Sequence, residues 1–383
     1  MARSAQKNLI LIENASQAKF FNKYFEKSTF ADEYDVIVAG PSAQVALINM
    51  NIPFIKSDHY FGNNEHIAVI KKANDILSVM RDGFDLSDSL GVKHAYEREF
   101  FGLFRYYYLN YCLSHLLIIH NAITDLKPQK VILPASIGPK NLDKRMTPLI
   151  SLIGYLGGLY LSEHKCEVIF EGEIIETEPD VAAAPVFALR AFFNIQLFLY
   201  KLLSRGKNVI WATHAAYNIP RVMEYLAKKV PAPISVGGSN LSGFRLLLSI
   251  LQRKSWKFYK FPPPTTNNDL NQFLDGYEKT VHQIEAKINN SSDVFSFHGV
   301  CLRGLIIEYL EHGLRNQIKD TFYGAQAFSN VLDIKRPAFL ISNQASGYNY
   351  AIGELCRSRN IDAMLISHGT HVSHDEPWAK AEW

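Results

Sequence analysis

A histidine beside a glycine near the end of the chain is the strongest local signal for chemistry. It lies in the segment Ile366-Ser367-His368-Gly369-Thr370-His371, directly after an apolar run that is typical of a strand. A neutral imidazole can take a proton from an attacking hydroxyl near neutral pH, and a glycine lets a phosphate approach the backbone. We therefore expect His368 to be catalytic, with Gly369 and Thr370 contacting substrate.

Two other interpretations of these histidines stay open. A histidine at the end of a strand can be purely structural, with its ring bonded to backbone groups. His368, His371 and His374 follow one another at three-residue spacing, which would also suit a metal ion. No cysteine or carboxylate lies at a convincing spacing to complete such a site, so we expect no metal.

Small and polar residues follow five other predicted strands. Ligands of open parallel sheets bind beyond the carboxyl ends of the strands, where a following helix offers backbone N–H groups to phosphate or carboxylate. We expect substrate contacts from Ser136, His214, Asn343 and the turn Gly237-Gly238-Ser239. The same residues can instead only make the turn and cap the helix. The five turns are Asn14-Ala15-Ser16, Gly40-Pro41-Ser42, Pro134-Ala135-Ser136 with Gly138, Thr213-His214, and Gly237-Gly238-Ser239-Asn240.

Two common nucleotide-binding signatures are absent from the sequence. It contains no G-x-G-x-x-G and no G-x-x-x-x-G-K-[ST], which argues against the usual dinucleotide-binding fold and against a P-loop enzyme. Acidic residues that follow predicted strands are scarce, so the sequence nominates no carboxylate nucleophile.

Strands and helices alternate over most of the chain, which is typical of an α/β protein with parallel sheets. A mostly helical stretch at about 60–126 interrupts the alternation. Near-continuous apolar runs predict interior strands, because both faces of a parallel sheet are covered. We therefore predict one or two Rossmann-like parallel sheets flanked by helices. The predicted interior strands are Asn8–Ile12, Lys130–Pro134, Asn208–Ala212, Ala338–Ser342 and Ala363–Ser367.

Three consecutive prolines, Pro262-Pro263-Pro264, predict an internal boundary because proline can continue neither a helix nor a central strand. Residues 1–261 would then form an α/β domain, and 262–383 a helical segment with a closing βαβ unit on the same sheet. A right-handed crossover in that unit would place Asn343 and His368 side by side, near the Gly237–Asn240 turn.

Composition indicates a folded protein, and the small charge surplus gives no reason to expect a nucleic-acid partner. The 383 residues are 48% hydrophobic and 20% charged, and 40 basic against 37 acidic residues leave a net charge of only +3. Four isolated cysteines indicate a reducing, cytoplasmic compartment. The apolar stretches Tyr106–Thr124 and Met146–Ser162 carry polar residues, or glycines that suit close helix packing, so we expect at most peripheral attachment to the inner face of a membrane.

The segment from Lys335-Arg336-Pro337-Ala338 to Leu365-Ile366-Ser367-His368-Gly369-Thr370 resembles the end of the N-terminal Rossmann-like domain of GT-B glycosyltransferases of bacterial surface-polysaccharide synthesis. Kdo and sialic acid transferases of capsule and lipopolysaccharide pathways are similar here, as are polyol-phosphate transferases of wall teichoic acid. In the teichoic acid enzymes the His-Gly-Thr tripeptide supplies a proposed catalytic base, which corresponds to His368, Gly369 and Thr370. The resemblance covers about residues 335–371. It implies a nucleotide-sugar donor as substrate, no separate cofactor, and a glycan or lipid-linked acceptor.

A GT-B enzyme places most donor contacts in a second Rossmann-like domain after this point, whereas the sequence ends at Trp383. We therefore expect most of the C-terminal donor domain to be lacking, with this portion of a longer chain forming the acceptor side and the edge of the cleft. Two alternatives to a glycosyltransferase stay open. One is a glycerol- or ribitol-phosphate transferase, and the other is a nucleotide- or sugar-binding subunit without turnover.

Overall fold

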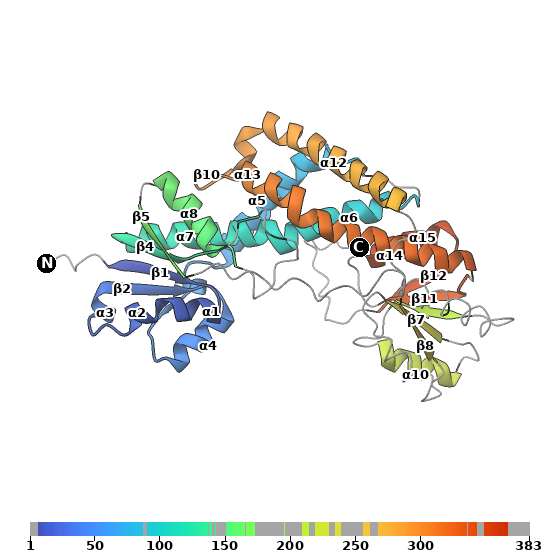
Figure 1. Cartoon of the computed structure of the whole chain (residues 1–383), viewed down its shortest axis with the longest axis horizontal. Coiled ribbons are helices and arrows are strands. Elements are labelled where there is room, and N and C mark those ends of the chain that lie inside the picture. The colour runs from blue at the N-terminus through green and yellow to red at the C-terminus, as the bar shows by residue number, and fades with distance from the viewer. Residues whose placement is uncertain are drawn as a thin grey trace. The chain divides into compact units, whose positions relative to one another are not determined.

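The computed structural model of the chain forms two compact units (Figure 1). Unit 1 comprises Met1–Asp85, Phe101–Pro179 and Glu278–Asn316, and unit 2 comprises Leu86–Phe100, Asp180–Tyr277 and Gln317–Trp383. The expected boundary at 261/262 lies within unit 2. The structure describes residues 7–86, 90–136, 138–139, 142, 151–164, 166–172, 195, 209–213, 219–229, 234–238, 256–260, 267–334, 336–342 and 348–366.

Unit 1 contains a five-stranded, fully parallel sheet in the order β3-β2-β1-β4-β5. Its strands are β1 (Asn8–Ile12), β2 (Tyr34–Val38), β3 (Ile55–Lys56), β4 (Lys130–Pro134) and β5 (Glu167–Glu171). The bounds of β1 and β4 are those predicted, and both strands lie inside the sheet. Their side chains from Leu9 to Ile12 and from Val131 to Leu133 are fully buried, which explains the continuous apolar runs.

Helices cover both faces of this sheet, with α1 to α4 on one face and α7 and α8 on the other (Figure 1). The mostly helical stretch predicted at about 60–126 is confirmed as α5, α6, η3 and α7, where η3 is a π-helical turn. The helical and hairpin elements of unit 1 are α1 (Ala15–Ala18), η1 (Lys19–Phe21), α2 (Asn22–Phe25), α3 (Phe30–Glu33), α4 (Pro41–Asn49), η2 (Ser57–His59), α5 (Asn63–Arg81), η3 (Arg105–Leu109), α7 (Asn110–Leu126), α8 (Ile153–His164), η5 (Ser292–Phe295), β9 (Ser296–Phe297), β10 (Val300–Cys301), α13 (Arg303–Glu308) and η6 (Tyr309–Leu314).

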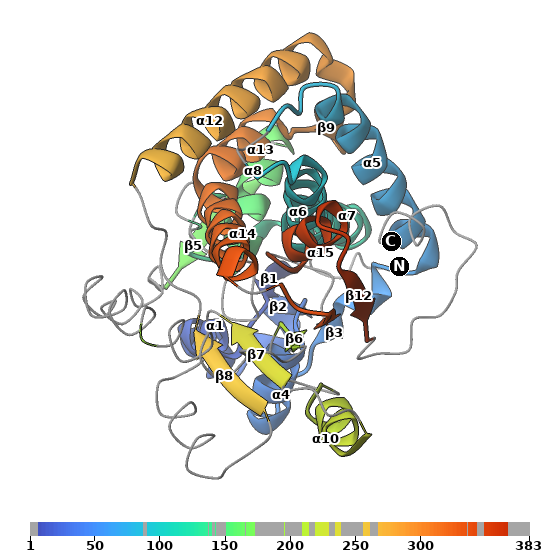
Figure 2. The same cartoon turned by 90° about the vertical axis from the view of Figure 1, so that its right-hand side faces the viewer.

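Unit 2 contains a second five-stranded parallel sheet, in the order β12-β11-β6-β7-β8. Its strands are β6 (Ile210–Ala212), β7 (Ile234–Gly238), β8 (Trp256–Lys260), β11 (Phe339–Ser342) and β12 (Asp362–Leu365). Strands β7 and β8 lie side by side in Figure 2. Its described helices include α10 (Ile219–Lys229) and α15 (Tyr348–Ser358), while α6 (Lys93–Phe104), α12 (Asn267–Asn290) and α14 (Arg315–Ile334) contain residues of both units.

The two sheets share one topology. Numbered by their place in the chain, the strands of each sheet follow the order 3-2-1-4-5, and a long helical segment joins the third strand to the fourth. The fold class, parallel sheets flanked by helices, is therefore confirmed. The closing βαβ unit β11-α15-β12 belongs to the second sheet and not to the first.

Two predictions for the second sheet were wrong. Strand β12 was expected inside the sheet, but among the described strands it pairs with β11 alone, and its four side chains are exposed. Gly237 and Gly238 were expected in a turn after a strand, yet both lie within β7, where they pair with Tyr259 and Lys260 of β8. The pairing with β8 prolongs β7 because each added residue gains ladder hydrogen bonds.

Neither long apolar stretch forms a transmembrane element in the part of the chain that the structure describes, where no helix is both long and apolar enough to cross a bilayer. All four cysteines are free thiols, two of them buried.

Candidate active site

The carboxyl edge of the first sheet gathers three of the predicted turns. Strands β1 and β4 are the neighbours at which the strand order reverses, and ligands of such sheets bind at this switch point. Glu13 and Asn14 follow β1, and Ser136 follows β4. The turn after β2 joins them, because the Ala15 N–H donates to Oγ of Ser42 at 3.3 Å.

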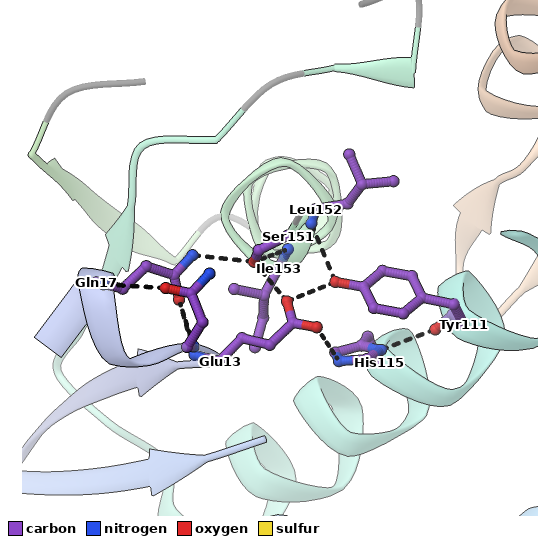
Figure 3. Close-up of polar contacts among 8 residues, drawn as sticks. Glu13, Gln17, Tyr111, His115, Ser151, Leu152 and Ile153 are labelled. Carbon is purple, nitrogen blue, oxygen red and sulfur yellow. Dashed lines mark hydrogen bonds and ion pairs between the residues drawn. The ribbon is translucent and has the colours of Figure 1, made fainter. Parts of the chain in front are cut away.

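Glu13 is the centre of a polar network at this edge (Figure 3). Its Oε2 accepts a hydrogen bond from the Tyr111 hydroxyl at 2.5 Å and another from the Ser151 hydroxyl. Its Oε1 lies 3.4 Å from Nε2 of His115, which makes an ion pair rather than an aligned hydrogen bond. The side chains of Glu13 and His115 are only 15% and 12% exposed, so this carboxylate and this imidazole face each other largely away from water.

Helix α7 delivers Tyr111 and His115 to the site. It leads into β4 from its own carboxyl end, so its first turns lie at the opposite, carboxyl edge of the sheet. The two residues are one turn apart on α7 and share a face. His115 Nδ1 lies 2.9 Å from the Tyr111 carbonyl, which can only accept, so Nδ1 carries a proton. Nε2 is then the atom that faces Glu13, and a proton there gives an imidazolium–carboxylate pair.

The remaining members of the Glu13 network come from the residues just before α8 and from α1. The Leu152 N–H donates to the Tyr111 hydroxyl oxygen at 3.0 Å. Gln17 spans the network, since its Nε2 donates to Oγ of Ser151 at 2.9 Å and its Oε1 accepts from the Glu13 N–H at 2.8 Å. Asn14 caps α1 by accepting from the Gln17 N–H at 3.0 Å. Backbone and side chains are thus fixed together, which preorganises the carboxylate.

The pKa shifts favour the ionised pair. Burial raises the pKa of Glu13, but the His115 charge and the hydrogen bonds from Ser151 and Tyr111 outweigh it, and the pKa lies below the ordinary 4.5. Burial lowers the pKa of His115, but the Glu13 carboxylate outweighs it, and the pKa lies above the ordinary 6.5. Burial and then the Glu13 charge raise the pKa of Tyr111, which keeps its proton. The site therefore holds a negative carboxylate at neutral pH.

Two glycines allow the backbone segments of this edge to approach. A Cβ on Gly40 would lie 2.1 Å from the Glu13 carbonyl oxygen, and one on Gly154 would lie 1.8 Å from the Pro134 carbonyl oxygen. Both distances are far below contact, so any side chain would push the turn or α8 away from the site. The glycines of the apolar stretch Met146–Ser162 were predicted to allow close packing of a helix. Gly154 against Pro134, and Gly157 against the Leu133 side chain, confirm this.

Three of the predicted contact residues lie in the described parts. Oγ of Ser136 accepts from the Tyr155 N–H at 2.7 Å, so it caps the first turn of α8 beside the site. Gly237 and Gly238 are strand residues. The remaining predicted residues, His214, Ser239, Asn343, His368, Gly369 and Thr370, lie outside the described residues, as do His371 and His374 of the metal alternative.

Described neighbours of these residues mark the switch point of the second sheet. Thr213 follows β6 and Ser342 ends β11, and these strands are adjacent. The Thr213 hydroxyl donates to Oγ of Ser342 at 3.3 Å, and Ser342 donates to Oδ1 of Asn349 at 3.3 Å. The expected adjacency of the two closing strands is confirmed, because Ser342 of β11 pairs with Leu365 of β12.

The sequence interpretation missed all four central residues of the network: Glu13, Tyr111, His115 and Ser151. Only Glu13 carried a local signal, a charged residue directly after a buried strand, and we had treated acidic residues at such places as scarce. Among the described residues, no three His, Cys, Asp or Glu side chains are grouped so as to hold a metal ion.

Comparisons with known proteins give no family. No protein-family model matches the chain, and no curated protein matches it. Among solved structures, the chain is similar to UDP-GlcNAc 2-epimerase from Methanocaldococcus jannaschii, with 8% identity, a TM-score of 0.23, and coverage of 95% of this chain and 89% of that one. It is also similar to Leishmania major tyrosyl-tRNA synthetase in complex with tyrosinol, with 11% identity, a TM-score of 0.20, and coverage of 98% and 78%. Values this low carry no argument, so the Rossmann-like description rests on the two sheets themselves.

Proposed function

We propose that the chain is a glycosyltransferase that uses a nucleotide-activated sugar, with unit 1 binding the acceptor and Glu13 acting as the general base. The observation that supports this is the ionised, largely buried carboxylate at the switch point of the first sheet. A carboxylate held at the place where α/β sheets bind ligands is suited to take a proton from a bound hydroxyl.

In the proposed reaction an acceptor hydroxyl oxygen attacks the anomeric carbon of the donor sugar. The bond from that carbon to the nucleotide phosphate oxygen breaks, and the nucleotide leaves with the electron pair. The hydroxyl proton passes to Glu13, because hydroxyl acidity rises as the new bond forms. Oε2 already accepts two hydrogen bonds, whereas among the described residues Oε1 contacts His115 alone, so Oε1 retains a lone pair for the substrate. The low pKa keeps the carboxylate ready between turnovers.

The second sheet carries the residues that the sequence nominated. His214 and Asn343 come directly after its two central strands, β6 and β11, and we assign them to substrate contacts together with Ser239, Gly369 and Thr370. His368 stays a second candidate for the catalytic residue. A surface-polysaccharide precursor as acceptor, either a glycan or a lipid-linked one, follows from the sequence resemblance alone. The donor is a substrate, so the proposal requires no cofactor.

The chain offers a matched control for Glu13. Glu171 ends β5 of the same sheet, its side chain is also 15% exposed, and it also accepts from a tyrosine, Tyr24, at 2.5 Å and pairs with a cation, Lys23. Strand β5 lies at the edge of the sheet, away from the switch point. The two glutamates therefore make similar contacts, but they differ in position and in the burial of the cationic partner, since His115 is 12% exposed and Lys23 is 61% exposed.

Turnover of Glu13→Gln and Glu171→Gln tests the proposal. Nucleotide release is measured with a panel of nucleotide sugars, and with nucleotide-activated polyol phosphates for the alternative transferase. Glu13→Gln should lower kcat by about 10²- to 10⁴-fold, the usual contribution of a general base, with Glu171→Gln close to wild type. Equal activity of the two variants would reject Glu13 as the base. Binding of nucleotide sugars without any turnover would favour the binding-subunit alternative.

A further inference from the structure

A buried cation lies on the same helical segment as the site, and the network of Glu13 does not use it. Arg105 begins the π-helical turn η3 and is only 9% exposed. Within the described residues its Nε is buried without a hydrogen-bond partner, and the guanidinium Cζ lies 5.5 Å from the centroid of the Tyr106 ring. Removing a cation from water costs several kcal/mol unless an anion compensates. A tyrosine face returns only about 0.5–2 kcal/mol, and no described carboxylate forms an ion pair with Arg105, so the cation is left undercompensated there.

A second unsatisfied polar atom lies one π-helical turn away. Oδ1 of Asn110 is buried and has no hydrogen-bond partner in the described part of the chain either. The Asn110 N–H donates to the Arg105 carbonyl, so the two residues stand one above the other across η3. A hydrogen-bond donor and an acceptor are thus both left unused within a single π-helical turn, and such turns occur frequently at functional sites.

The place of η3 along the helix connects it to Glu13. Tyr111, whose hydroxyl contacts Glu13, directly follows Asn110. With a helical rise of about 1.5 Å per residue, Arg105 lies about 9 Å or slightly less before Tyr111 along the axis, on the side that leads away from β4. This is the outer side of the carboxyl edge of the first sheet.

We propose that Arg105 binds an oxyanion of the acceptor, either the carboxylate of an acidic sugar or a phosphate. A guanidinium matches both groups because it offers two parallel N–H donors. Asn110 Oδ1 accepts from a hydroxyl of the same sugar, and the exposed rings of Tyr106 and Tyr107 flank the entry to η3. The inference rests on the proposed acceptor role of unit 1, and it narrows the acceptor to an anionic glycan or a phosphate-linked one.

Arg81 provides the matched control. Its Cζ also lies 5.5 Å from an aromatic centroid, that of Phe101, but Arg81 is exposed on α5.

The full chain is titrated with glucuronate, glucose 6-phosphate and glucose, and Kd is read by ligand-detected NMR. Wild type and Arg81→Gln should bind at least one charged sugar about tenfold more tightly than glucose, and Arg105→Gln should lose that preference. The tighter of the two charged probes identifies carboxylate or phosphate as the source of the oxyanion.

Arg105→Lys serves as a second variant, because it keeps the charge without the two-pronged geometry and should show an intermediate preference. Loss of the buried unpaired charge should not unfold the chain, and circular dichroism of each variant confirms the fold. The measurement needs neither donor nor turnover, so it fails or succeeds independently of the role of Glu13. Absence of any charge preference in wild type, or an unchanged preference in Arg105→Gln, would overturn the proposal.

Discussion

Replacing Glu13 by glutamine separates the contribution of the ion pair from that of the hydrogen bonds around it. Glutamine keeps an oxygen that can accept from Tyr111 and Ser151 but carries no charge for His115. An uncompensated imidazolium in this position would cost about 3–5 kcal/mol. His115 avoids that cost by releasing its proton, since burial lowers its pKa once the carboxylate is gone. Glu13→Gln should therefore lower the free energy of unfolding by the smaller amount, about 1–3 kcal/mol, which comes from the weakened hydrogen bonds.

The loss of stability in Glu13→Gln should depend on pH. The pKa of Glu13 is lowered on folding, so its stabilisation is present above about 4.5 and is lost as pH falls through the folded pKa. The pKa of His115 is raised on folding, so its stabilisation is present below about 6.5 and is lost as pH rises through the folded pKa. The stability deficit of Glu13→Gln should consequently be largest between these two values and shrink on either side.

The assay must report on unit 1. All four tryptophans, Trp211, Trp256, Trp378 and Trp383, belong to unit 2, so tryptophan fluorescence does not follow the site. Hydrogen exchange of the β1 amides reports on the stability of the site, because this strand is buried and directly precedes Glu13. Glu171→Gln is the control, with an expected cost under about 1 kcal/mol for a pair whose Lys23 is 61% exposed. A deficit of equal size at pH 5.5 and pH 9 would refute the ionised pair.

Two further predictions concern the frame of unit 1. Gly154→Ala should destabilise the fold by about 1–3 kcal/mol, because its Cβ would lie 1.8 Å from the Pro134 carbonyl oxygen. Gly102→Ala, on a helix with open space, should instead stabilise by up to about 1 kcal/mol, and thermal unfolding of both variants checks the contrast. Burial lowers the pKa of His120 and of His298, and the like charge of a neighbouring histidine lowers it further, so stability should decline as pH falls below about 6.5. His298→Asn, which tolerates the positive φ of 47° there, should reduce that decline in urea unfolding at pH 5, and an unchanged pH dependence would count against it.

Much of the fold could be predicted from the sequence, because the signals for single elements are local. The runs Asn8–Ile12 and Lys130–Pro134 are continuous and apolar, and the structure places both strands inside a sheet with the predicted bounds. The same reasoning placed Ala363–Ser367 inside a sheet, where it fails: the described strand β12 is at an edge. A run of four apolar residues shows that a segment is extended, but not how many neighbours it has.

The repeated topology was not visible in the sequence. Each sheet is assembled from three strands and then two more beyond a long helical segment, so β1 meets β4 across more than a hundred residues. Strand order depends on pairings between distant segments, and no local pattern records them.

The candidate site, like the fold, could be predicted from the sequence only in part. The sequence by itself determined that β1, β2 and β4 end in turns able to face a ligand, because the residues of those turns are adjacent in the chain. Tertiary structure alone decided that Glu13 would meet Tyr111, 98 residues away, and Ser151, 138 residues away. A charged residue after a strand is ordinary until folding buries it opposite a histidine. Only then does the nearby imidazole hold its pKa below the ordinary value and keep it ionised, and its place at the switch point makes it a candidate base.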